Sequence, residues 1–251
     1  MINPIKTNSW IVYSKHNPQA SLRLFCFPYA GGGASIFRTW QENLPATIEV
    51  CPIELPGRGT RMGYSLFTKL SPLLQALTEA LLPYLDKPFA FFGHSFGALL
   101  CFELAHLLYK DYDLEPVHLL VSGRQAPQIP DRAPLHALNE LMLMAELHRL
   151  NGTPKAVLDN PEMMQLLMPI LRADLAIDET YAYASKTPLK CPITVFGGLQ
   201  DPETNLDDLE AWRQHTSNCF SLHMLPGDHF FINTAQLFLL QVISRELQLI
   251  V

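Results

Sequence analysis

A serine between two glycines carries the strongest chemical signal in the sequence. The pentapeptide GHSFG at residues 93–97 follows an apolar run at 89–92 and opens a helical pattern at 96–109. A serine on such a tight strand-to-helix turn forms a nucleophile elbow, in which the glycines leave room for the turn. The N-terminus of the following helix would direct backbone N–H groups at the reacting atoms. The spacing therefore predicts that Ser95 is a nucleophile.

A serine hydroxyl needs a base and an orienting acid, and after such an elbow they follow in the order acid, then histidine. His229 lies in the segment PGDHFF, in a glycine-containing loop after the last apolar run. Asp201 lies in GGLQDP, directly after the run at 193–196. Glu203 and Asp228 are alternative acids, although Asp228 adjoins the base and would point away from it. We expect His229 to take the serine proton and Asp201 to hold its tautomer and stabilise the imidazolium.

An oxyanion hole needs two backbone N–H donors. Phe96, the residue after the nucleophile, would supply one, and the loop FPYAGGGAS at 27–35 would supply the other. We expect the second donor to be Ala30, with Tyr29 as the alternative. Three successive glycines let the backbone of this loop approach a ligand closely. A nucleotide site is disfavoured, because the triplet lacks Gly-Lys-Ser/Thr and does not fit G-x-G-x-x-G.

Short apolar runs alternate with helical patterns along the chain. Strands are predicted for six runs, at 22–27, 48–53, 88–92, 117–121, 193–196 and 220–225. Helices are predicted at 68–85, 96–109 and 234–247. This alternation is typical of an α/β protein with a mostly parallel central sheet and helices on both faces. Since the pattern spans both ends of the chain, we expect a single domain over residues 1–251.

The segment from about residue 133 to 186 interrupts the alternation, with helical patterns and no convincing strand. Three prolines are expected to divide it into short helices: Pro154, Pro161 and Pro169. Five of the eight methionines lie here, and flexible thioether side chains suit apolar ligands of varied shape. We therefore expect a helical lid, with Met142 and Met164 as candidate substrate contacts. An ordinary helical excursion packed on the sheet is the alternative.

Composition excludes several other classes of protein. Hydrophobic residues make up 48% of the 251 residues and charged residues 17%, which is too apolar for a disordered chain. The net charge of −6 argues against general nucleic-acid binding, which needs a basic face. No apolar run approaches the roughly 18 residues that cross a bilayer, and the first residues lack a signal-peptide pattern. The cysteines are too widely spaced for a Cys-x-x-Cys metal site, so we expect reduced cysteines and a cytoplasmic protein.

Five motifs, in order along the chain, resemble those of one known family. They are FPYAGGGASIF at 27–37, ELPGRGTRM at 54–62, FFGHSFGALL at 91–100, GGLQDP at 197–202 and PGDHFFI at 226–232. Together they resemble the type II thioesterases, stand-alone α/β-hydrolases that accompany nonribosomal peptide and polyketide synthases. The resemblance runs from about Arg23 to Leu247 and implies an α/β-hydrolase fold with a helical lid insertion. It also implies hydrolysis of acyl or aminoacyl thioesters on the phosphopantetheine arm of carrier proteins, which clears misprimed or stalled synthases.

The resemblance places the triad on the same serine, aspartate and histidine and also marks Arg58 and Arg61. Contact with substrate or with the phosphate of the carrier arm is one interpretation of these arginines, and a salt bridge that pins the loop is the other. The resemblance implies no metal and no bound cofactor, since the substrate itself carries phosphopantetheine. The implied partners are acyl or peptidyl carrier domains of a synthase. We expect a monomer that docks on them transiently. Carrier proteins are commonly acidic and this chain has a net charge of −6, so docking would depend on a local apolar or basic patch rather than on long-range attraction.

Other functions remain compatible with the same residues. A medium-chain fatty acyl or acyl-CoA thioesterase, or a general esterase, would use the same triad. An acyltransferase would pass the acyl group from Ser95 to an alcohol or amine instead of water. A non-catalytic binding protein is disfavoured, because it predicts a missing triad member and none is missing.

Overall fold

Six parallel strands form one sheet in the order β2-β1-β3-β4-β5-β6. The structure is a computed structural model and describes residues 10–14, 16–130 and 134–248. The strands are β1 (Leu22–Phe27), β2 (Ile48–Pro52), β3 (Phe89–His94), β4 (His118–Ser122), β5 (Ile193–Gly198) and β6 (Phe220–Leu225). The first five are buried along their whole length, as expected for parallel strands covered on both faces. The predicted α/β class with a parallel sheet is confirmed.

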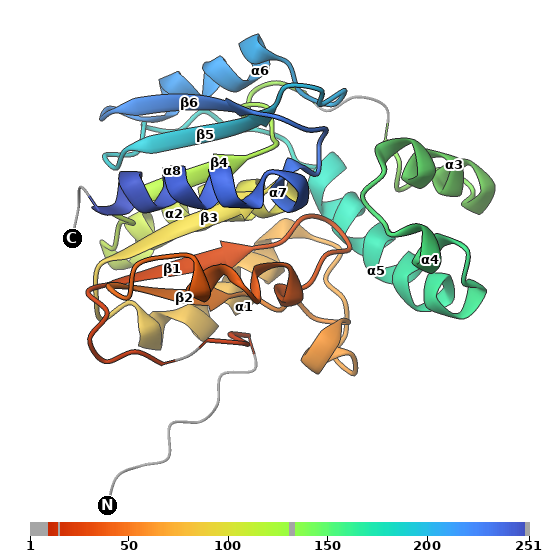
Figure 1. The fold of residues 1–251 in the computed structure, drawn as a ribbon, viewed down its shortest axis with the longest axis horizontal. Helices are drawn as coiled ribbons and strands as arrows, with labels where there is room; N and C mark the ends of the chain where they lie inside the picture. The colour runs from red at the N-terminus through yellow and green to blue at the C-terminus, as the bar shows by residue number, and fades with distance from the viewer. Residues whose placement is uncertain (1–9, 15, 131–133, 249–251) are drawn as a thin grey trace, which may run out of the picture.

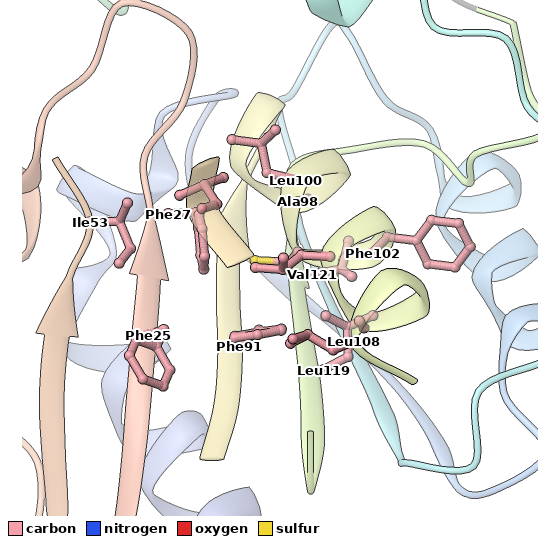
Figure 2. Close-up of a cluster of buried hydrophobic side chains, with 14 of the residues drawn as sticks. Phe25, Phe27, Ile53, Phe91, Ala98, Leu100, Phe102, Leu108, Leu119 and Val121 are labelled. Atoms are coloured by element: carbon pink, nitrogen blue, oxygen red, sulfur yellow. The ribbon is translucent and has the colours of Figure 1, made fainter. Parts of the chain in front are cut away.

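Alternate strand residues point to opposite faces of the sheet, and each face packs against its own helical layer. On one face, Phe25, Phe91 and Leu119 pack with α1 (Leu70–Leu81) and α2 (Phe96–Tyr112). Figure 2 shows Phe91 and Leu119 of the sheet next to Leu108 of α2. The opposite face packs against α7 (Phe231–Thr234) and α8 (Gln236–Gln248), which lie in front of the sheet in Figure 1. A short helix, α6 (Leu206–Glu210), follows β5. The two layers hold the carboxyl ends of the strands in fixed positions.

Three helices are inserted between β4 and β5: α3 (Glu140–Leu150), α4 (Lys155–Leu158) and α5 (Pro161–Glu179). In Figure 1 they extend away from the sheet, with α5 leading outward to α4. This α3–α5 insertion has an apolar cluster of its own, which includes Leu143, Leu147 and Met168. Near its C-terminal end, α5 packs into the main core through Ile177. The predicted start of the insertion at Ala133 lies outside the described residues.

The predicted break at Pro169 is wrong, because α5 continues through this proline from 161 to 179. Proline removes one backbone donor from a helix interior. Here its neighbours Met168, Ile170 and Leu171 are all buried, so their packing holds the helix across the defect. Pro161 instead begins α5, in the first turn, where a backbone N–H has no hydrogen-bond partner within the helix.

The last predicted helix is also different in detail. It forms two pieces, α7 and α8, that meet at Ala235 rather than one helix from residue 234. No helix in the described ranges is long and apolar enough to cross a membrane.

Candidate active site

Ser95 lies on the turn between β3 and α2 with φ 53° and ψ −115°, a conformation that residues other than glycine avoid. Two glycines make the turn possible. A Cβ on Gly93 would lie 2.2 Å from the carbonyl oxygen of Gly97, and one on Gly97 would lie 2.2 Å from that of Phe27. The N–H of Ser95 donates to the Ser122 carbonyl at 2.7 Å, which ties the turn to β4. The serine therefore has the geometry of a nucleophile elbow.

Asp201 and His229 meet beyond the carboxyl ends of β5 and β6. His229 Nδ1 lies 2.9 Å from Asp201 Oδ2, and the Asp201 side chain is fully buried. Asp201 also accepts hydrogen bonds from the Glu203 N–H and the Thr204 hydroxyl. Burial alone would raise the pKa of Asp201, but the hydrogen bonds, led by that of His229, lower it below its ordinary value. An ionised carboxylate only accepts, so His229 carries its proton on Nδ1 and keeps Nε2 free to take another.

The two alternative acids have other partners. Glu203 forms an ion pair with Arg149 of α3 at 2.9 Å. Asp228 accepts from the Phe230 N–H at 2.9 Å and from the Asn151 side chain at 3.4 Å. The structure brings Asp201 to the imidazole and brings neither Glu203 nor Asp228 to it.

Ser95 and His229 both line a pocket of about 900 Å³. The backbone of Ser95 is held on both sides, because its N–H donates to Ser122 and its carbonyl accepts from the Ala98 N–H at 2.9 Å. Apolar side chains of the insertion form much of the opposite wall, among them Met142, Leu147, Val157, Leu167, Ile170 and Leu171. A pocket of this size, mainly apolar with a few polar groups at one end, suits a small molecule with a carbon chain.

The glycine loop after β1 forms another part of the pocket wall. Tyr29 and Ala30, the two candidate donors, both line the pocket. Phe96 has a buried side chain, and its N–H belongs to the first turn of α2, where no intrahelical acceptor exists. Gly31 has φ +75°, and its N–H donates to Asp174 of α5 at 2.8 Å. The shape of the loop is thus fixed by a residue of the insertion.

Arg58 belongs to the same arrangement. Its guanidinium donates to both carboxylate oxygens of Asp174, at 2.6 and 2.8 Å, and to the Gly32 carbonyl at 2.9 Å. Arg58 also borders the pocket, although only 6% of the residue is exposed. These bonds favour the interpretation in which Arg58 pins the loop.

Arg61 is held by aromatic rings. Its guanidinium carbon lies 3.9 Å from the ring centre of Trp10 and 4.3 Å from that of Tyr64. These distances are those of cation–π contacts. Arg61 therefore connects the loop to the N-terminal segment rather than to the pocket.

The two methionines singled out from the sequence lie in different places. Met142 is half-exposed on the pocket wall. Met164 is buried in the apolar cluster of the insertion, while its neighbour Met163 lines the pocket. Adjacent helical residues point about 100° apart, so the rotation of α5 about its axis decides which methionine faces the pocket. The sequence carries no signal for that rotation.

His94, inside the elbow, lies beneath the turn. Its two ring nitrogens contact the Ser122 hydroxyl and the His229 carbonyl. Asp174 was missed by sequence reasoning, since its partner Arg58 is 116 residues away. Over the described part of the chain, no group of three or more His, Cys, Asp or Glu residues is arranged to hold a metal ion.

Comparisons with known proteins found similar sequences and similar solved structures. The thioesterase domain family matches residues 22–246. The chain is 46% identical to "Linear gramicidin dehydrogenase LgrE" of Brevibacillus parabrevis over 97% of this chain and 94% of that protein. It is 45% identical to "Gramicidin S biosynthesis protein GrsT" of Aneurinibacillus migulanus over 98% and 96%. Among solved structures, RedJ, a thioesterase of the prodiginine pathway in Streptomyces coelicolor, superposes in its polyethylene glycol complex with a TM-score of 0.87. That match has 38% identity and covers 92% of this chain and 93% of RedJ.

Proposed function

Because this chain belongs to the thioesterase domain family and is a hydrolase of thioester bonds, we propose that it releases acyl and aminoacyl groups from the phosphopantetheine arm of carrier proteins. In this proposal Ser95 is the nucleophile, His229 the general base and Asp201 the acid that orients it. The observation that carries the proposal is that His229, hydrogen-bonded to Asp201 at 2.9 Å, and Ser95, held at φ 53°, line the same pocket.

The first half of the reaction forms an acyl-enzyme. His229 Nε2 takes the hydroxyl proton as Ser95 Oγ attacks the thioester carbonyl. The N–H groups of Phe96 and Ala30 stabilise the oxyanion, and each such donor is worth roughly 10²–10³ in kcat. The C–S bond breaks as the imidazolium returns the proton to the departing pantetheine sulfur. Asp201, which stays ionised, stabilises the imidazolium throughout.

Water completes the second half of the cycle. His229 takes a proton from a water molecule as its oxygen attacks the acyl-Ser95 carbonyl. The ester C–O bond then breaks, Ser95 Oγ regains the proton, and the acid leaves. Every proton transfer passes through His229 while Asp201 stays ionised, so we propose that the reaction uses no metal and no bound cofactor.

The α3–α5 insertion acts in this proposal as a lid whose inner wall receives the acyl chain. Its outer part contacts the acid and base loops through half-exposed polar groups, Arg149 with Glu203 and Asn151 with Asp228. Exposed pairs of this kind contribute little to stability. The inner part of α5 is anchored by the buried pair of Asp174 with Arg58. We therefore place the hinge of the lid within α5, with α3 and α4 on its moving side.

The names of similar proteins support a role beside a synthase. GrsT is named for gramicidin S biosynthesis and RedJ for prodiginine biosynthesis, and both share more than a third of their residues with this chain. RedJ also binds a polyethylene glycol molecule in its active site. The apolar wall of the pocket in the present chain likewise supports the proposal that its ligand is a flexible acyl chain. The proposed partners are carrier domains, and the proposed role is removal of stalled or misprimed groups.

The dehydrogenase named in LgrE is not part of the proposal. The glycines at 31–33 lack the spacing of a dinucleotide-binding fingerprint. Glu54 occupies the space beside them, since a Cβ on Gly33 would lie 2.8 Å from its carboxylate oxygen. This loop supports an oxyanion hole better than a dinucleotide site.

A panel of carrier proteins loaded with acetyl, medium-chain and aminoacyl groups tests the proposal. We expect hydrolysis of all three classes by the wild-type protein and almost none by Ser95→Ala. Hydrolysis by Ser95→Ala at the wild-type rate would refute the assignment of the nucleophile. A strong preference for bulky chains over acetyl would contradict the role in clearing misprimed synthases.

A fatty acyl or acyl-CoA thioesterase is the second candidate, favoured by the apolar pocket wall. The ratio of kcat/KM between an acyl-carrier protein and the matching acyl-CoA separates the two, with a p-nitrophenyl ester as the general esterase control. Higher kcat/KM for the acyl-carrier substrate supports the first proposal. Analysis of products with added alcohols and amines distinguishes hydrolysis from acyl transfer.

A further inference from the structure

A continuous series of hydrogen bonds runs beneath the elbow from the backbone of Ser95 to the backbone of His229. The Ser95 N–H donates to the Ser122 carbonyl at 2.7 Å. The Ser122 hydroxyl lies 2.8 Å from His94 Nδ1, and His94 Nε2 lies 2.9 Å from the His229 carbonyl oxygen. A carbonyl only accepts, so His94 carries its proton on Nε2, and Nδ1 accepts from the Ser122 hydroxyl. Both nitrogens of one tautomer are thereby satisfied.

The surroundings of His94 hold the ring in one orientation. The residue is fully buried and is absent from the pocket wall, so it does not meet the substrate. Gly123, with φ +59°, leaves room for it, because a Cβ there would lie 2.8 Å from His94 Cε1. The rings of Tyr29 and Phe231 pack edge-on, with ring centres at 5.8 and 5.4 Å. Burial, aided by the nearby His229, lowers the pKa of His94 to about 3, so the ring stays neutral.

Two different restraints act on His229. The hydrogen bond that His229 Nδ1 donates to Asp201 controls rotation of the imidazole about its own side-chain bonds. It does not control where the backbone of residue 229 lies relative to the elbow. That backbone belongs to a loop containing Gly227, at φ +122°, and its carbonyl is held by His94. The strut from Ser122 through His94 therefore connects the two chain segments whose side chains must exchange a proton.

We propose that His94 is a positioning residue that, with Ser122, sets the separation between the Ser95 hydroxyl and the His229 imidazole. The inference rests on the proposed function, in which these two groups exchange a proton. A displacement of about 1 Å between reacting groups lowers a rate by up to about 10²-fold. Loss of the strut should therefore lower kcat and leave KM almost unchanged, since the pocket that binds substrate is not altered.

The test compares His94→Phe with His118→Phe as a matched control. His118 is also buried, 3% exposed, and is hydrogen-bonded to Thr194 at 2.8 Å. It lies at the amino end of β4, at the opposite end of that strand from Ser122. Both changes remove one buried imidazole, so both should lower Tm. Only His94→Phe should lower kcat per folded molecule, by about 10- to 100-fold, with KM within about threefold of wild type.

Two further variants distinguish positioning from a general loss of structure. His94→Gln keeps an N–H donor near the place of Nε2 and should recover kcat to within about fivefold of wild type, the equivalent of one ordinary hydrogen bond. Ser122→Ala keeps the carbonyl that holds Ser95 but removes the hydroxyl, and should lower kcat by about fivefold. These variants also test the proposal if His94→Phe does not fold.

Labelling by a fluorophosphonate reports the reactivity of Ser95 without a carrier protein. Its rate should fall in His94→Phe in parallel with kcat. Wild-type kcat and labelling in folded His94→Phe, or an equal loss of kcat in His118→Phe, would overturn the proposal. Failure of the proposed function is recognised separately, because Ser95→Ala would then still hydrolyse the carrier thioester whatever the His94 variants do.

Discussion

Replacing Gly97 with alanine tests the connection between the elbow and the oxyanion loop. A Cβ at residue 97 would lie 2.2 Å from the Phe27 carbonyl oxygen and 2.8 Å from that of Pro28. Both are backbone atoms at the end of β1, so no side-chain rotation relieves the overlap. Ordinary van der Waals contact begins near 3.4 Å, which means that the strand end and the helix must separate by about 1 Å. Ala30 lies only two residues beyond Pro28 and should move with it.

The expected result is a loss in both activity and stability. A displaced oxyanion donor should lower kcat by about 10²-fold. Overpacking of a buried site should lower the free energy of unfolding by about 1–3 kcal/mol. In a domain of this size, that loss lowers Tm by several degrees. Stopped-flow measurement of acyl-enzyme formation, together with thermal unfolding followed by circular dichroism, measures the two effects.

Gly63→Ala is the matched control, because a Cβ at residue 63 meets nothing within 4 Å. It should leave both kcat and Tm unchanged. If folded Gly97→Ala retained kcat within about twofold of wild type, the proposed link between the β1 end and the oxyanion hole would be refuted.

Three further changes have defined outcomes. Asp201→Asn removes the charge that would stabilise the imidazolium and should lower kcat by about 10³–10⁴-fold. Its Tm should fall less than that of a variant in which a large core side chain is shortened. A loss of kcat below tenfold in steady-state kinetics would exclude Asp201 as the orienting acid. Burial lowers the pKa values of His94, His118 and His215 to about 3, 4 and 4 in the folded protein. The same histidines have a pKa of about 6.5 in the unfolded chain, so below pH 6.5 the unfolded chain binds more protons than the folded protein does. Stability contributed by these neutral rings is full above pH 6.5 and is lost toward pH 4, by up to about 1.4 kcal/mol per pH unit for each histidine. His118→Phe should therefore flatten the dependence of Tm on pH in that window, and an unchanged slope would contradict the assignment. Leu167→Trp fills the apolar pocket wall and should lower kcat/KM for a medium-chain substrate by about tenfold while sparing acetyl; equal losses for both would argue that the acyl chain lies elsewhere.

Strand positions were predictable because parallel strands covered on both faces are apolar throughout. The run at 220–225 matches β6 at both ends, whereas β3 continues to His94, two residues beyond its apolar run. Those two residues belong to the elbow, where hydrogen bonding to the neighbouring strands extends the sheet into the turn that holds Ser95. Apolar patterning alone does not mark such an extension.

The pairing of Asp201 with His229 was predictable for a related reason. Both residues follow the carboxyl ends of neighbouring parallel strands, which meet at one edge of the sheet. The contacts of Asp174 with Arg58 and Gly31 were not predictable, because they join segments separated by 116 and 143 residues across a helical insertion. The direction of such a helix depends on tertiary packing, which neither periodicity nor turn residues specify.

Most of the apolar side chains of the pocket wall come from one stretch of chain, which does not contain the proposed triad. These apolar side chains lie between residues 135 and 175, whereas Ser95, Asp201 and His229 lie outside that stretch. In the proposed function, insertions, deletions and exchanges in this stretch would change which acyl group is accepted and would leave the triad in place. The boundary for such exchange is set by Asp174 and Asp178, whose pairs with Arg58 and Arg124 fasten α5 to the loops around the nucleophile. A chimaera made with a relative should therefore join upstream of Asp174, because a junction after it would replace the residue that shapes the oxyanion loop.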